Sequence, residues 1–141
     1  MRYPMKSIGV TTYVLVVEPD PAFGADLADW LRQRNVVPVL TSSVHEAAIT
    51  MHDALFMDSC FDGLLLNFKL PDAPGYRVVS EFRNEFPGRP IGIMYEQDDL
   101  CLKPWSRARG IPLFRKPFSL EALNHWLEVL QAPTVAGIVR N

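Results

Sequence analysis

The sequence has few of the residues on which several common functions depend. It contains only 2 cysteines, Cys60 and Cys101, which match no CxxC pattern, so we expect reduced thiols rather than a redox or zinc motif. Its formal net charge is −2, which gives no electrostatic reason to expect nucleic acid or a membrane as a partner. No apolar run approaches the roughly 20 residues that span a bilayer, and no glycine-rich phosphate-binding motif occurs.

The N-terminus lacks the apolar core of a secretion signal, so a cytoplasmic protein is expected. The composition, 48% hydrophobic and 21% charged over 141 residues, is that of one soluble globular domain with a real core. We expect residues 1–12 to form a leader and residues 13–131 to form the domain. Residues 132–141 would then be a tail or the stub of a linker.

Apolar runs alternate with amphipathic segments throughout the domain. Continuous apolar or β-branched runs predict strands at 13–17, 36–40, 63–68, 91–95 and 113–115. Helical periodicity follows each strand. The alternation predicts an α/β fold, a flavodoxin-like (βα)5 doubly wound parallel sheet with strand order 2-1-3-4-5. Ligands bind such sheets at the carboxyl ends of the first and third strands, where Glu18-Pro19-Asp20 and Asn67 stand.

Two of the helices carry unusual signals. A fourth helix is predicted from about Asp98 to Arg109, although Pro104 should kink or shorten it. Ser119 is predicted to cap one last helix, whose apolar stripe comprises Leu120, Leu123, Leu127 and Leu130.

Three segments, in this order, resemble the receiver domain of response regulators in two-component signalling. They are Val14 to Pro21 (VLVVEPDP), Leu64 to Gly75 (LLLNFKLPDAPG) and Phe114 to Phe118 (FRKPF). The resemblance extends from about Tyr13 to Leu130. It implies phosphoryl transfer from a kinase to a strand-end aspartate, assisted by Mg²⁺, a lysine and a small hydroxyl group.

The residues at the phosphoacceptor site depart from the family pattern. Asn67 stands at the acceptor position, and an amide is a poor nucleophile toward phosphorus. Pro19 replaces a metal-binding acid and offers no side-chain oxygen, while Glu18 and Asp20 keep carboxylates beside it. Mg²⁺ requires well-placed oxygens in near-octahedral geometry, so tight metal binding is not expected.

Two further positions complete the altered pocket. Tyr95 stands where the family has serine or threonine, and its ring is bulky enough to cover the crevice. Lys116 matches the family lysine, and we expect its ammonium group to pair with Glu18. Pro117 resembles the proline that follows a cis peptide bond in the family.

The resemblance therefore implies a degenerate, atypical pseudo-receiver with no catalytic residue, no bound metal, no cofactor and no enzymatic activity. We expect it to signal by phosphorylation-independent contact with a protein partner: a kinase, an effector or an attached output domain. One alternative is a small-molecule sensor that binds an anionic or neutral ligand through Lys116, Asn67 and Tyr95. The other is a receiver phosphorylated at a non-standard acceptor, such as Asp62 or Asp72.

The partner surface is expected on the face of the fourth helix, fifth strand and fifth helix, which carries dimer contacts in receivers. Aromatic residues and arginines dominate interface energetics, and this face has both. Leu113 stands where the family has an aromatic switch residue. A homodimer is part of this prediction, with contacts from Trp105, Arg109, Leu113, Arg115 and Trp126.

Overall fold

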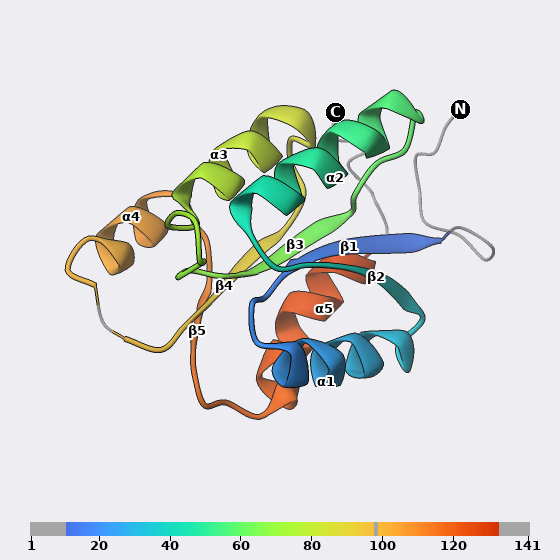
Figure 1. Ribbon diagram of the computed structural model, residues 1–141. Helices are drawn as coiled ribbons and strands as arrows, with labels where there is room; N and C mark the ends of the chain where they lie inside the picture. Colours follow the sequence, from blue (N-terminus) through green and yellow to red (C-terminus); the bar gives the residue numbers. More distant parts are fainter. Residues whose placement is uncertain (1–10, 98, 133–141) are drawn as a thin grey trace.

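A five-stranded parallel sheet forms the centre of the protein (Figure 1). The computed structural model describes residues 11–97 and 99–132. The strands pair in the order β2-β1-β3-β4-β5, which confirms the predicted α/β fold class and strand order. Their bounds are β1 Thr12–Val17, β2 Val36–Thr41, β3 Gly63–Asn67, β4 Ile91–Tyr95 and β5 Leu113–Arg115.

Helices cover both faces of the sheet. Helices α1 and α5 lie on one face, whereas α2 and α3 lie on the other with α4 beside them (Figure 1). The central strands β3 and β4 are buried at every position, which explains why they read as continuous apolar runs. The helical bounds are α1 Pro21–Arg32, α2 Val44–Phe56, α3 Tyr76–Glu85, α4 Leu102–Ala108, the 3₁₀ turn η1 Leu120–Leu123 and α5 Asn124–Gln131.

Strand β3 shows how the sheet divides the core. Leu64 and Leu66 pack into the cluster beneath α2 and α3, while Leu65 points to the cluster beneath α1 and α5. All three are fully buried, and burial of each leucine contributes about 1.5–3 kcal/mol. The strand emerges at Asn67, so its apolar packing fixes where the candidate acceptor residue stands.

Two glycines let α5 approach the sheet closely. A Cβ at Gly92 would lie 2.9 Å from Leu65 Cδ2 and 3.1 Å from Phe114 Cε2, and one at Gly63 would lie 3.2 Å from Trp126 Cη2. Larger residues at these positions would collide with the core. The Trp126 ring occupies the space that the glycines leave.

The fourth and fifth helices differ from their predicted bounds. Helix α4 begins at Leu102 rather than near residue 98 and spans 7 residues, which confirms that it is shortened. Pro104 lies in its first turn, where a missing N–H is tolerated. The last helix is split into η1 and α5, and Ser119 makes no side-chain capping bond, so the prediction of one helix capped by Ser119 is wrong.

The ends of the predicted domain are only partly described. β1 begins at Thr12, a position that was predicted to belong to the leader. Residues 1–10 and 133–141, which hold most of the predicted leader and tail, lie outside the described residues. Within the described part, no helix is long and apolar enough to cross a membrane.

Candidate functional site

A crevice lies at the carboxyl ends of β1, β3, β4 and β5, where the sequence predicts the site. One hollow, of about 480 Å³, is lined by Asn67, Tyr95 and the loop that follows β3. A second, of about 560 Å³, is lined by Asp20, Phe23, Lys116 and their neighbours, and Glu96 lines both. The described crevice thus brings together the residues that the sequence singled out.

A buried ion pair between Glu18 and Lys116 crosses the crevice. The Lys116 ammonium group donates to Glu18 Oε1 at 2.8 Å, and the two side chains are 10% and 1% exposed respectively. This confirms the predicted pairing. Glu18 Oε2 accepts a second hydrogen bond from the Asp20 N–H at 3.0 Å. Both carboxylate oxygens are therefore engaged, as a buried charge requires.

Lys116 is held by more than its ion pair. Its ammonium nitrogen lies 4.3 Å from the centroid of the Phe23 ring, a cation–π contact. Its backbone N–H donates to the Tyr95 carbonyl at 2.7 Å. The Lys116–Pro117 peptide bond is cis, as the resemblance implied. The lysine is thus fixed in place, with its charge compensated inside the protein.

Asn67 keeps one of its polar atoms unsatisfied. Its Nδ2 donates to the Lys69 carbonyl at 2.8 Å, which sets the amide orientation, since the opposite one would place two oxygens together. The residue is 7% exposed, and Oδ1 is buried without a hydrogen-bond partner. The amide can accept one hydrogen bond here, but it carries neither the charge nor the nucleophilicity of a carboxylate.

The acidic residues after β1 do not fit a divalent metal. Asp20 caps α1 through Oδ1, which accepts from the Ala22 N–H at 3.0 Å. Pro19 has no side-chain oxygen, and Glu18 is occupied by Lys116. No group of three or more metal-binding side chains occurs among the described residues. Because Mg²⁺ needs several free oxygens in octahedral geometry, we derive no metal-dependent step.

Tyr95 forms part of a wall rather than a cover. It is 7% exposed, belongs to the core cluster on the side of α2 and α3, and lines the smaller hollow. The Tyr95 side chain thus packs with the core cluster and also borders the crevice at the end of β4.

Asp72 has a structural role in the loop after β3. Its two carboxylate oxygens accept from the Val44 and His45 N–H groups, both at 2.9 Å, at the start of α2. These hydrogen bonds, that from Val44 first, hold the pKa of the Asp72 carboxyl below its usual value. No local pattern indicated this contact, because Val44 and His45 are 28 and 27 residues away from Asp72 in the sequence.

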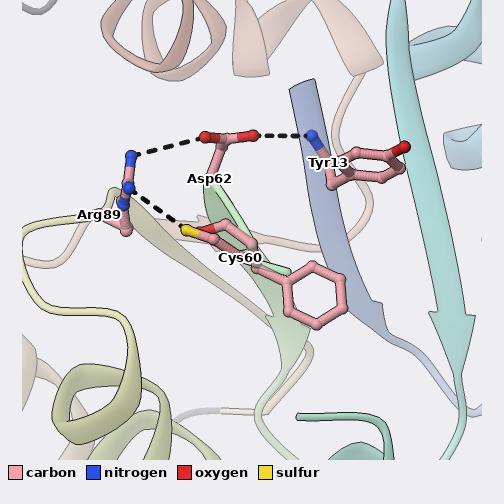
Figure 2. Close-up of polar contacts among 5 residues, drawn as sticks. Tyr13, Cys60, Asp62 and Arg89 are labelled. Atoms are coloured by element: carbon pink, nitrogen blue, oxygen red, sulfur yellow. Dashed lines mark hydrogen bonds and ion pairs between the residues drawn. The ribbon is translucent and has the colours of Figure 1, made fainter. Parts of the chain in front are cut away.

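Asp62 lies at the opposite edge of the sheet. Its Oδ2 accepts from the Tyr13 N–H at 2.9 Å, and its Oδ1 lies 3.5 Å from Arg89 Nη1 (Figure 2). The other terminal nitrogen of Arg89, Nη2, donates to Cys60 Sγ at 3.2 Å. Asp62 therefore joins β1 to two loops far from the crevice. Its distance from the crevice disfavours it as a substitute acceptor, as the sequence indicated.

The predicted partner residues divide between the two faces of the sheet. Trp105 and Leu113 pack against the cluster beneath α2 and α3, and Trp105 contacts the Tyr76 ring at 4.7 Å and the Arg109 guanidinium at 4.6 Å. Trp126 belongs to the opposite cluster and is 4% exposed. Its side chain is largely buried and also lines the groove described next. Arg115 is exposed on β5.

A groove of about 620 Å³ lies between β5 and α5, beside the end of α4. The sequence analysis named this face, but of its predicted contact residues only Trp126 is among the lining residues of the groove. An exposed apolar position on α5, Val129, was the available signal. The lining includes Arg107, Pro112, Phe114, His125 and Val129.

The chain matches no family model and no curated protein. It is similar in structure to the non-phosphorylated HemR receiver domain from Leptospira biflexa, at 22% identity and a TM-score of 0.72, over 86% of this chain and 95% of that one. A CheY-like receiver domain protein from Methanospirillum hungatei has 19% identity and a TM-score of 0.74, with 85% and 94% covered. CheY4 of Vibrio cholerae has 20% identity and a TM-score of 0.69, with 85% and 98% covered. The protein therefore has the fold of response-regulator receiver domains.

Removing the ammonium group of Lys116 should leave the buried Glu18 carboxylate without a counter-charge. We expect Lys116→Met to lower the free energy of unfolding by on the order of 3 kcal/mol, because Glu18 loses its counter-charge. Adding Glu18→Gln should recover most of that loss. Urea unfolding at neutral pH measures both effects. Lys69→Met, on an exposed lysine beside the crevice, is the matched control, and equal effects of the two lysine changes would contradict this role.

The Asp72 cap should make stability depend on pH. Since its folded pKa lies below the ordinary value of 3.8, its contribution is present above that value and is lost as the pH falls through the folded pKa. We expect Asp72→Asn to lower the melting temperature at about pH 6 and to have less effect at about pH 3. Asp53→Asn, on exposed α2 surface, is the control. An effect of Asp72→Asn that is equal at both pH values would contradict the role of its charge.

Proposed function

We propose that this protein is a degenerate receiver that signals through phosphorylation-independent protein contacts. The observation that carries the proposal is the combination of Asn67 at the end of β3 with the closed Glu18–Lys116 pair. Asn67 lacks the nucleophilic carboxylate. The ion pair already engages the Lys116 ammonium group, which would otherwise bind a phosphoryl group. The receiver fold supports a role in signal transduction, while the altered crevice favours a constitutive mode.

The ion pair opposes use of the crevice by an anion. To bind a phosphoryl group or another anion, Lys116 would have to leave Glu18, which would then be an unpaired charge in a site that is 1% exposed. Such uncompensated burial costs several kcal/mol. This argues against the alternative of an anion sensor that uses Lys116. The capping role of Asp72 and the location of Asp62 similarly disfavour a receiver with a substitute acceptor.

The groove between β5 and α5 is the proposed partner surface. Its lining combines apolar side chains, Phe114 and Val129 among them, with the polar side chains of Arg107 and His125. Aromatic residues and arginine are enriched in protein interfaces. With no chemical switch in the crevice, the groove would keep one shape. A partner protein or a second copy would bind it without prior activation.

Acetyl phosphate should not label the protein. We expect intact mass measurement after incubation with Mg²⁺ and acetyl phosphate to show no phosphoryl adduct, since Asn67 offers no carboxylate nucleophile. Asn67→Asp alone should also stay unlabelled, because Pro19 supplies no metal ligand and Lys116 remains paired with Glu18.

The informative positive control combines Asn67→Asp with Pro19→Asp, which returns both the nucleophile and one metal ligand. An adduct on the unmodified chain that hydroxylamine removes would refute phosphorylation independence. Strong labelling of the Asn67→Asp single variant would show instead that the ion pair does not block the site.

Constitutive association should depend on the groove. We expect Val129→Glu to lower the affinity of association at least about ten-fold, because it would place a charge in an apolar contact. Sedimentation measures self-association, and a capture experiment measures partner binding. Val129 is 52% exposed, so the fold should persist by circular dichroism. Ile49→Glu, at a 47% exposed position on α2, is the matched control. A monomer at all concentrations, with equal partner capture by both variants, would exclude this surface.

A further inference from the structure

Most of the exposed large hydrophobic residues in the described part of the chain lie on two surfaces. Of the 9 such residues, 5 gather where α2 ends above the beginnings of β1 and β2, and another, Val129, lines the groove between β5 and α5. Isolated exposed hydrophobic residues are normal, whereas a cluster marks a contact surface. We name the first surface the α2 corner, and it consists of Tyr13, Val37, Leu55, Phe56 and Met57.

The topology explains why the residues of the α2 corner lie together. Tyr13 and Val37 are register partners in neighbouring strands, so their side chains share a face of the sheet. Leu15 and Val17, at alternate positions along β1, pack beneath α2, which places Tyr13 on that same face. Figure 1 shows the last turn of α2 above this end of the sheet. The corner therefore joins the end of a helix to the beginnings of two strands.

The α2 corner and the groove have complementary shapes. Phe56 and Met57 stand at the end of α2 and are 89% and 71% exposed, so their side chains project from the surface. The groove is a hollow of about 620 Å³ with a largely apolar lining. Clefts of roughly 300–1,000 Å³ are large enough to bury most of a drug-sized group. The groove can thus receive the two projecting side chains.

The two surfaces also differ in charge. The carboxyl end of α2 carries the negative end of the helix dipole, and its last turn, which the structure describes in full, holds no basic residue. Asp53 and Asp58 are exposed beside it. Arg107 lines the groove, and none of the described residues of that lining is acidic. Opposite charges that flank two apolar surfaces favour contact between those surfaces and set its orientation.

This complementarity favours contact between two copies of the chain. One copy cannot join its own surfaces, because the corner lies on the side of β2 and the groove on the side of β5, which are the two edges of the sheet. A two-fold contact would pair each surface with itself. It would then bring two acidic corners together, or place one Arg107 against another. A contact between unlike surfaces avoids both repulsions.

We propose that copies of this chain associate head to tail, with the α2 corner of one copy bound in the groove of the next. Phe56 and Met57 enter the groove, and Asp53 and Asp58 lie near Arg107 of the neighbouring copy. The inference rests on the proposed function, because it takes the groove as the contact surface, and it identifies the occupant as a second copy. Each copy keeps one free corner or groove, so the association extends into open chains.

Sedimentation of complementary variants tests the proposal in the full chain. We expect the unmodified chain to form species larger than a dimer as its concentration rises, because a head-to-tail contact leaves both ends open. Phe56→Ser alters only the corner and Val129→Glu only the groove, and each alone should lower the affinity of association at least about ten-fold. An equimolar mixture of the two variants should recover a 1:1 complex that grows no further, since it joins one intact corner to one intact groove.

Three further measurements serve as controls. Leu100→Ser, at a 97% exposed position outside both surfaces, should associate like the unmodified chain. Phe56 and Val129 are 89% and 52% exposed, so circular dichroism should show that both variants keep the fold. Arg107→Glu should weaken association as well, because it would place a like charge near the acidic corner.

Several results would overturn the proposal. A monomer at all concentrations would exclude self-association. Two variants that stay monomeric when mixed would exclude a contact between unlike surfaces. A closed dimer that only one of the two variants dissolves would show a two-fold contact through that surface instead. The proposed function is judged separately, by whether Val129→Glu lowers the capture of a different protein.

Discussion

The ion pair between Glu18 and Lys116 is the interaction on which the crevice depends. It joins the carboxyl ends of β1 and β5, which β3 and β4 separate in the sheet. Its two charges are almost fully buried, so each stabilises the other in a place where either alone would be costly. The pair also positions the backbone around it: Glu18 holds the Asp20 N–H, and the Lys116 N–H binds the Tyr95 carbonyl. The two charges in the crevice consequently neutralise each other, and the ion pair links the carboxyl ends of β1 and β5.

Carboxylates around this crevice serve the helices. Asp20 accepts from the first turn of α1, Asp72 from the start of α2, and Asp99 from the Cys101 N–H just before α4. In a parallel sheet all of these helices begin at the same edge, where their unpaired N–H groups gather. Acidic side chains there accept hydrogen bonds from these N–H groups and interact favourably with the positive end of the helix dipole. Such carboxylates stabilise the fold without any chemical step.

A protein of this kind would signal through its surface. The proposed groove beside α5 does not depend on a group that is transferred or bound in the crevice.

Local pattern in the sequence was sufficient for the sheet, whereas the crevice positions Tyr95, Lys116 and Pro117 were identified through the resemblance to receiver domains. Continuous apolar runs indicated strands buried on both faces, and the alternation with helices determined the parallel order, because the strand ends of such a fold meet at one edge. The Glu18–Lys116 pair was predictable for the same reason. The bounds of α4 and α5 were predicted less well from the sequence. Whether a helix starts just before a proline, or begins with a 3₁₀ turn, depends on contacts with neighbouring elements. Only the tertiary structure showed that Asp72 caps α2, that Trp126 lies on two glycines in the core, and that Tyr95 turns inward. These arrangements join residues distant in the sequence, and their geometry is decided by packing, which no local pattern encodes.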